Sequence, residues 1–148
     1  MLIADYDIRR RLDDIPLQQE NGWSWYGAAV QDDQVFATTF SFEEPDLRHL
    51  LRKLPDSIPF QVAKEPNQLL TDVLGALEEV FNGKGRESYA LMINLNHLSS
   101  YTQKVLNCTR LVSVGYVTSY GAIAKVVGGS PRSVGRVEAS NAVPLLIP

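Results

Sequence analysis

Residues 115–148 read GYVTSYGAIAKVVGGSPRSVGRVEASNAVPLLIP, and this stretch decides the fold of the C-terminal third of the chain. Ser119 precedes an apolar segment that the pair Gly128-Gly129 brings to an end, which is the pattern of a short capped helix. Ser130 and Pro131 then mark a second helix start, because serine caps helices and proline is tolerated at the first helical position. Two short helices joined by a glycine turn predict a helix-turn-helix.

The second of these helices carries two arginines. Arg132 and Arg136 are four residues apart, so their side chains leave the same face of the helix. Arg132 lies in the first turn, where an inserted helix comes closest to DNA. A solvated face on a plain packing unit would have the same spacing, so the spacing alone leaves both interpretations open.

Charge is distributed unevenly along the chain. Residues 1–99 hold 9 Lys/Arg against 16 Asp/Glu, a net charge of −7, whereas residues 100–148 hold 5 Lys/Arg against 1 Asp/Glu, a net charge of +4. This asymmetry indicates that the C-terminal part meets a polyanion. Chance clustering in a short window is the alternative.

The residues before this block predict a small domain of strands and helices. Residues 23–42 alternate aromatic or β-branched side chains around a polar turn, which indicates an antiparallel hairpin. Helices are predicted between Pro45 and Pro55 and between Pro66 and Gly83, and a further strand over residues 88–95.

The expected fold is therefore α+β, with two domains. Residues 1–98 should form a variable domain, a small antiparallel sheet with helices. Residues 99–148 should form a helix-turn-helix, winged-helix-like DNA-binding domain. Its first helix is expected to start with a capping box of Ser100 and Gln103 and to end at Gly115.

Composition argues against several kinds of protein. With 148 residues and 45% hydrophobic content, the chain fits one soluble domain or two subdomains sharing a core. No apolar run of about 18 residues could span a bilayer, and the charged N-terminus is unlike a secretory signal, so we expect a cytoplasmic protein, or one of the nucleoid or nucleus, without a membrane partner. The lone Cys108 and the distant His49 and His97 predict no disulfide, no metal site and no cofactor.

The C-terminal block is more specific than a generic helix-turn-helix. It contains VTSYGAIA, PRSVG, NAVP and LLIP in this order. In this it resembles the methylated-DNA-protein-cysteine methyltransferases, also called alkylguanine-DNA alkyltransferases. Their pattern reads V-T/I-S/T-Y-x-x-L/I-A, P/A-R-A-V-G and N-P-x-P-I/L-x-I/V-P, followed at once by Cys-His-Arg. The resemblance covers about residues 101–148, and the upstream residues fit the family's variable domain in outline.

The resemblance implies a suicide DNA-repair reaction on double-stranded DNA. The family binds through the minor groove, rotates an alkylated guanine out of the stack, and moves the alkyl group from the base oxygen to a cysteine thiolate. Extrusion is needed because the thiolate must approach the alkyl carbon in line, which an intact stack forbids. We expect a monomer.

The resemblance also assigns DNA-binding residues. Arg132 would fill the space that the flipped base leaves, and Tyr120 would crowd the backbone phosphate. Ser119, Ser133 and Arg136 are expected to contact DNA beside them. The alternative for Tyr120 is a core aromatic with its hydroxyl at the surface.

The resemblance also implies catalytic and pocket roles for residues of both helices and of the segment that follows them. Asn141 would orient the nucleophile through hydrogen bonding, and the base pocket would be lined by Tyr120, Glu138, Val143 and Pro144. In this interpretation NAVPLLIP is the strand that delivers the nucleophile. The alternatives are that Asn141 simply ends a helix and that Pro144 only shapes an extended segment.

The sequence departs from the family pattern at several places. The nucleophilic Cys-His-Arg would follow Pro148, where this sequence stops, so the chain as given is expected to be inactive in transfer. Cys108 is expected to be a structural helix residue and no replacement. Glu138 stands where the family commonly carries an apolar residue, and a carboxylate is costly to desolvate there unless it turns outward on a frayed helix end. Ala142 replaces the proline of the N-P pair.

Three interpretations stay open at this point. The first is an alkyltransferase with an incomplete sequence, for which a UGA codon after Pro148, read as selenocysteine or tryptophan, is one specific hypothesis. The second is a non-catalytic binder of alkylated or distorted DNA, as in the alkyltransferase-like branch. The third is a structural or interaction module whose partner covers the apolar VPLLI segment.

Overall fold

The structure is a computed structural model that describes most of the chain. The described residues are 2–6, 25–41, 50–56, 59, 61–63, 67–83, 91–113 and 115–148. The first part of the helix predicted between Pro45 and Pro55, up to residue 49, lies outside these ranges. Of the rest, Leu50 and Leu51 are described as helical.

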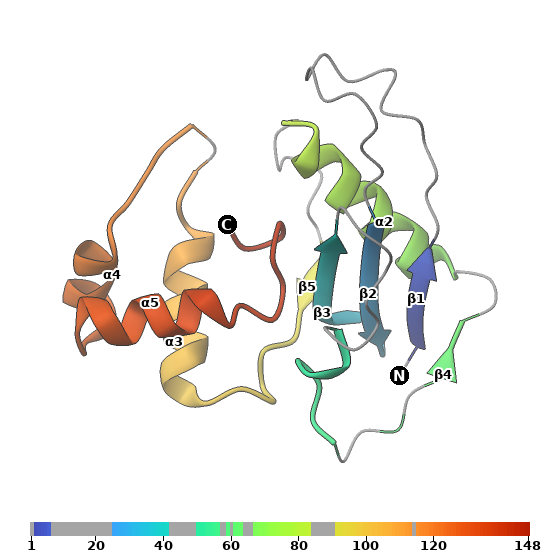
Figure 1. The fold of residues 1–148 in the computed structure, drawn as a ribbon, viewed down its shortest axis with the longest axis horizontal. Coiled ribbons are helices and arrows are strands. Elements are labelled where there is room, and N and C mark those ends of the chain that lie inside the picture. The colour runs from blue at the N-terminus through green and yellow to red at the C-terminus, as the bar shows by residue number, and fades with distance from the viewer. Residues whose placement is uncertain are drawn as a thin grey trace.

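A five-stranded mixed sheet forms the N-terminal part (Figure 1). The strands are β1 Leu2–Tyr6, β2 Trp25–Gln31, β3 Gln34–Ser41, β4 Gln61–Val62 and β5 Met92–Ile93, in the order β4-β1-β2-β3-β5. The three central strands are antiparallel, which confirms the predicted hairpin. The two edge strands pair in parallel, which the sequence did not predict, because each is only two residues long and its partner strand is distant in the sequence.

A β-bulge interrupts the pairing of β2 with β3. The pairs Ala29–Ala37 and Val30–Val35 leave Phe36 as an extra residue on β3. The bulge reverses the alternation of side chains along the strand. The valine pair packs into the core under α2, whereas the alanine pair packs in a separate small cluster.

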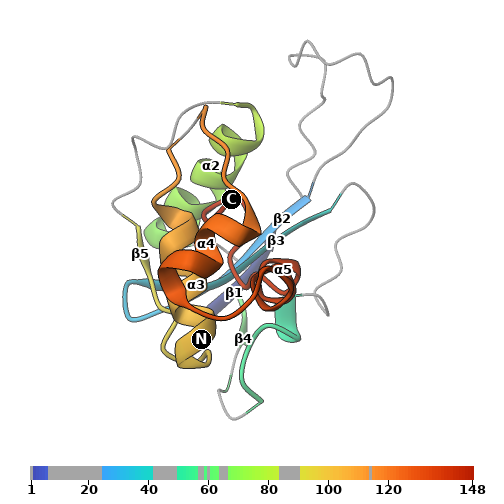
Figure 2. The same ribbon diagram turned by 90° about the vertical axis from the view of Figure 1, so that its left-hand side faces the viewer.

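Helix α2, Gln68–Phe81, covers one face of the sheet (Figure 2). Asn67 caps it, because its Oδ1 accepts a hydrogen bond of 2.9 Å from the Leu70 amide. Leu70, Val73 and Leu77 are fully buried, as expected for a stripe at helical spacing. The chain leaves the helix through Gly83 at φ +73°, so the predicted helix and its glycine terminus are confirmed.

Helix α3, Ser100–Arg110, differs from the prediction at both ends. The capping residue is Ser99, whose hydroxyl accepts from the Thr102 amide, so the predicted capping box that starts at Ser100 is wrong by one position. Two adjacent serines satisfy the same pattern, and sequence alone cannot choose between them. The helix ends at Arg110, followed by Leu111 as its C-terminal cap, and not at Gly115.

Helices α4, Tyr120–Val127, and α5, Pro131–Ala139, form the predicted helix-turn-helix. Ser119 and Ser130 cap them as expected. The turn between them uses Gly128 at φ +88° and Gly129 at φ +87°, a conformation that a residue with a Cβ rarely adopts. Figure 1 shows α3, α4 and α5 gathered on one side of the sheet.

One hydrophobic core joins the sheet to these three helices. A single cluster includes Leu77 from α2, Leu106 from α3, Val134 from α5 and Ile147 near the C-terminus. This confirms an α+β protein, while the domain boundary after residue 98 stays a prediction. None of the helices in the described ranges has the length and apolar character needed to cross a bilayer.

Candidate nucleic-acid interface

Helix α5 has an apolar face and a basic face. Val134 and Val137 are buried against the core, whereas Arg132 and Arg136 are exposed. The two arginines are four residues apart and therefore project from the same side. The predicted basic face exists and is open to solvent.

Tyr120 lies beside this basic face. It is the first residue of α4, and its ring packs onto Gly135 of α5. A Cβ built at Gly135 would lie 3.1 Å from Cε2 of Tyr120, so the ring owes its close approach to the missing side chain. Tyr120 is 51% exposed and is not a core aromatic. Because Gly135 is three residues after Arg132, the tyrosine ring and the arginine lie on the same side of α5.

Ser119 and Ser133, which were predicted to contact DNA, both make hydrogen bonds within the protein. Ser119 caps α4 through a 3.1 Å bond from the Ala122 amide. Ser133 completes the cap of α5, since its hydroxyl oxygen accepts from the Ser130 amide at 2.9 Å. The same hydroxyl lies 2.7 Å from Oη of Tyr101 on α3. Ser133 thus ties α5 to α3, and its contact with DNA stays a prediction.

Glu138 turns toward α3. Its Oε1 accepts a hydrogen bond of 2.6 Å from Oγ1 of the buried Thr109. The carboxylate is therefore half-buried with a partner, and it is not directed outward from a frayed helix end. Together with the Tyr101–Ser133 contact, it flanks the apolar packing of α5 on α3.

The segment after α5 is a compact turn, so its prediction as a strand is wrong. Both ends of the turn are held by Asn141, whose Oδ1 accepts from the Val143 amide at 2.9 Å and whose Nδ2 donates to the Ile147 carbonyl at 3.0 Å. Leu145 has φ +71°, which breaks any extended path. Asn141 is thus a clamp for residues 141–148 and does more than end a helix.

This C-terminal turn rests on the edge of β3, to which the chain runs after α5 (Figure 1). The Thr38 amide donates to the Ala142 carbonyl at 2.9 Å, and the Thr38 hydroxyl donates to the Pro144 carbonyl at 2.8 Å. Val143 is fully buried and Pro144 is half-buried. Thr38 was not predicted, because a contact between residues 106 positions apart has no local signature.

Among the described residues, Lys53 and His97 have pKa values that depart clearly from the ordinary ones. Nζ of Lys53 donates to the Thr38 carbonyl at 2.9 Å, and burial lowers the pKa of this lysine from 10.5 to about 8. Burial also lowers the pKa of His97, an effect that the nearby backbone of Lys53 opposes. The imidazole stacks on Phe36 with ring centroids 5.7 Å apart.

Cys108 packs partly buried against the core from α3, in agreement with its predicted structural place. Over the described ranges, no three His, Cys, Asp or Glu side chains come together as a metal site would require. The helix setting of Cys108 matches that of a small apolar residue.

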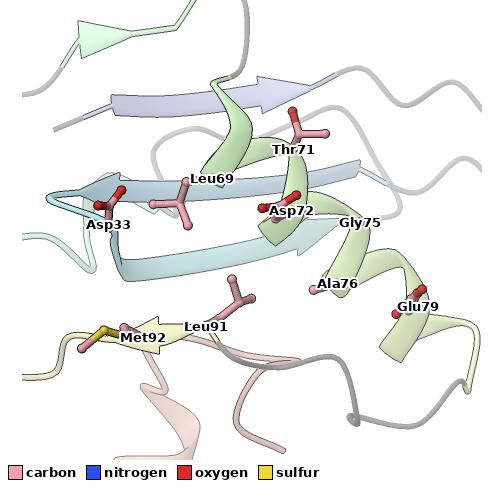
Figure 3. A pocket seen from close by; sticks show the side chains of 9 residues that line it. All are labelled: Asp33, Leu69, Thr71, Asp72, Gly75, Ala76, Glu79, Leu91 and Met92. Carbon is pink, nitrogen blue, oxygen red and sulfur yellow. The ribbon is translucent and has the colours of Figure 1, made fainter.

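An open pocket of about 540 Å³ contains none of the residues predicted to bind DNA, and Figure 3 shows the side chains that line it. It is lined by α2, the β2–β3 turn and β5, and it carries the carboxylates of Asp33, Asp72 and Glu79. Such carboxylates would repel phosphate. The pocket shares no residue with the predicted base pocket, which stays a prediction.

The family comparison matches the part of the chain that carries this interface. Residues 100–148 match the family described as "6-O-methylguanine DNA methyltransferase, DNA binding domain". The match begins at the first residue of α3 and includes α4, α5 and the Asn141 turn.

Similar proteins come from archaea. The methylated-DNA–protein-cysteine methyltransferase of Pyrococcus furiosus is 26% identical over 130 residues, which cover 83% of this chain and 74% of that protein. The protein of the same name from Metallosphaera sedula is 35% identical over 82 residues, covering 55% of this chain and 52% of that protein. The second match thus spans about half of each protein.

Solved structures share the fold over nearly the whole chain. O6-methylguanine-DNA methyltransferase from Pyrococcus kodakaraensis superimposes with a TM-score of 0.63 at 20% identity, covering 99% of this chain and 82% of that one. The Mycobacterium tuberculosis OGT in complex with DNA gives a TM-score of 0.66 at 16% identity, covering 100% and 75%. Residues 100–148 therefore match the DNA-binding domain of the 6-O-methylguanine DNA methyltransferases, and the chain as a whole resembles the methylated-DNA–protein-cysteine methyltransferases in sequence and in fold.

Proposed function

We propose that this chain recognises alkylated guanine in double-stranded DNA, with α5 in the minor groove and the base rotated toward the Asn141 turn. The observation that carries the proposal is the exposed Arg132–Arg136 face beside the half-exposed ring of Tyr120. It lies in a segment that matches a methyltransferase DNA-binding domain. The chain would act as a monomer inside the compartment that holds the DNA.

Electrostatics supports α5 as the element that meets DNA. Every basic side chain of residues 100–148 is exposed: Lys104, Arg110, Lys125, Arg132 and Arg136. The single acidic residue of this part, Glu138, faces α3 through Thr109 and so does not oppose phosphate on the basic face. Phosphate neutralisation by such a face releases counterions, which favours binding.

Base extrusion is assigned to Arg132 and Tyr120. An arginine in the first turn of α5 can occupy the gap that a rotated base leaves, and a tyrosine ring beside it can press on the phosphate. Unstacking costs a few kcal/mol and costs least at a damaged or mispaired base, so extrusion itself favours lesions.

Asn141 is proposed to shape the reactive side of the site. Its amide closes the turn that ends at Ile147 and Pro148, and so fixes the direction in which the chain leaves this turn. In the family pattern the acceptor cysteine comes directly after the matched Ile-Pro. We propose that Cys108 is not an acceptor, and that residues 1–148 by themselves bind DNA without transferring the alkyl group.

Binding is tested with Arg132→Ala in a fluorescence-polarisation titration of duplex DNA. We expect the Kd to rise about tenfold, the loss of about 1.4 kcal/mol that one charge-assisted contact can supply. Arg52→Ala removes an exposed arginine from the N-terminal part and serves as the matched control with unchanged affinity. Equal affinity of wild type and Arg132→Ala would contradict the proposal.

Transfer is tested by intact mass after incubation with an oligonucleotide that carries O6-methylguanine. For residues 1–148 we expect no gain in mass. A gain of one methyl group that disappears in Cys108→Ser would make Cys108 the acceptor and overturn the binding-only assignment. A preference for the modified duplex without any mass gain supports the alternative of a non-catalytic binder for this part of the chain.

A further inference from the structure

Thr38 links the N-terminal sheet to the C-terminal turn. It is fully buried in the middle of β3, far from the matched domain in sequence. Its amide and its hydroxyl reach two carbonyls of the turn, those of Ala142 and Pro144, at 2.9 and 2.8 Å. These two hydrogen bonds fix both the position and the orientation of the turn relative to β3.

The edge of β3 explains why this contact forms. The parallel strand β5 pairs with β3 at Gln34 and Val35, and the Asn94 amide adds a bond to the Val35 carbonyl. Farther along the same edge, the backbone groups of Thr38 would be buried without partners. An unpaired buried group costs about 1–3 kcal/mol, so the turn and β3 stabilise each other.

Lys53 engages the remaining backbone group of Thr38, its carbonyl. Its Nζ donates 2.9 Å to the Thr38 carbonyl, so all three hydrogen-bonding groups of Thr38 are engaged. The ammonium is partly desolvated there, which strengthens a charge-assisted bond. Thr38 is thereby held in one place between a lysine and the turn.

We infer that Thr38 is a positioning residue, through which the N-terminal sheet sets the geometry of the turn that borders the base site. The inference rests on the proposed function for the role of the turn in lesion recognition. Lys53 supports it by fixing Thr38. The N-terminal part is in this view a component of the recognition site as well as a scaffold.

The direct test is hydrogen exchange of the turn amides, those of residues 142, 143 and 145–147, in Thr38→Val, which keeps the shape and removes the hydroxyl. We expect exchange of these amides to rise about tenfold, with exchange in α2 unchanged as the check on folding. Thr38→Ser should restore slow exchange. Thr39→Val, on the other face of the same strand, is the matched control. Unchanged exchange in Thr38→Val would overturn the inference.

The functional arm compares affinity for a plain duplex with affinity for a duplex carrying O6-methylguanine. In Thr38→Val we expect plain-duplex affinity to stay the same and the preference for the modified duplex to fall about tenfold, with recovery in Thr38→Ser. Faster exchange with an unchanged preference would refute the recognition role of Thr38. Failure of the wild type to bind either duplex would refute the proposed function, while the exchange result would still decide whether Thr38 positions the turn.

Discussion

Gly135 sets the position of the Tyr120 ring. A substitution at Gly135 can test the effect of this position on DNA binding separately from its effect on the stability of the fold. In Gly135→Ala the new Cβ would start 3.1 Å from the ring, so the half-exposed tyrosine must shift. Alanine also raises helix propensity by about 0.5–1 kcal/mol. We therefore expect equal or higher thermal stability together with a several-fold loss of duplex affinity, measured by calorimetry and fluorescence polarisation.

Gly121→Ala is the control for this change. It makes the same substitution in α4, where the nearest atom, Oγ of Ser119, is at an ordinary 3.7 Å. Its affinity should match that of the wild type. If Gly135→Ala bound DNA equally well, the placement of Tyr120 would not matter for binding.

Because of Lys53, the free energy of unfolding should depend on pH in the alkaline range. The folded pKa is about 8 against 10.5 unfolded, so between these values the unfolded chain binds more protons. The free energy of unfolding of the wild type should then rise with pH from about 8 to 10.5 relative to Lys53→Met, by roughly 1–2 kcal/mol after allowing for solvent screening.

Urea unfolding of both proteins at several pH values measures this difference. Lys104→Met, at an exposed position of α3, is the control for loss of a lysine. If the difference in the free energy of unfolding between the wild type and Lys53→Met stayed constant between pH 8 and 10.5, the Lys53 ammonium would not be desolvated in the folded state.

At the level of elements, the turn between α4 and α5 depends on two glycines for different reasons. Both have positive φ, but a Cβ on Gly128 meets open space, whereas one on Gly129 would lie 2.5 Å from Oη of Tyr101. Gly129→Ala should therefore destabilise the fold by at least about 1 kcal/mol more than Gly128→Ala, the value of one disrupted hydrogen bond. Urea midpoints of the two variants measure this, and equal midpoints would contradict it.

The same elements show how far sequence can predict this structure. Helices α2, α4 and α5 were predicted correctly because cap, apolar stripe and terminal glycine are all local signals. The start of α3 was missed by one residue because two serines compete. The parallel edges of the sheet and the bond from Thr38 to the turn depend on residues far apart, which leave no periodic pattern.

The candidate site, too, has features that could be predicted from the sequence and features that could not. The arginine face and Tyr120 could be predicted from spacing and resemblance, and their exposure agrees with the expectation. The partner of Glu138 on α3 could not, because Thr109 carries no signal that it faces α5. Its hydrogen bond explains how a carboxylate is accommodated where an apolar residue was expected.

For the molecule as a whole, the opposite charges of its two parts predict a strong effect of salt. If Lys125, Arg132 and Arg136 each neutralise one phosphate, the plot of log Kobs against log salt should have a slope of about −2.7. Arg136→Ala should reduce this slope by about 0.9. Titrations between 50 and 200 mM salt measure it. A slope near zero would mean that the basic face does not meet the DNA backbone.

The bulge at Phe36 determines which residues of β3 lie on each face of the sheet. Because side chains alternate along a strand, the single extra residue determines that Thr38, and not Thr39, faces the C-terminal turn. A regular ladder through Phe36 would pair Thr38 with Gly27 in place of Ala28, which would exchange the faces of the two threonines and disconnect the turn from the sheet. Deletion of the bulged residue alone would keep Thr38 opposite Ala28, so related proteins that lack the bulge but keep the contact with the turn should also be one residue shorter in this strand.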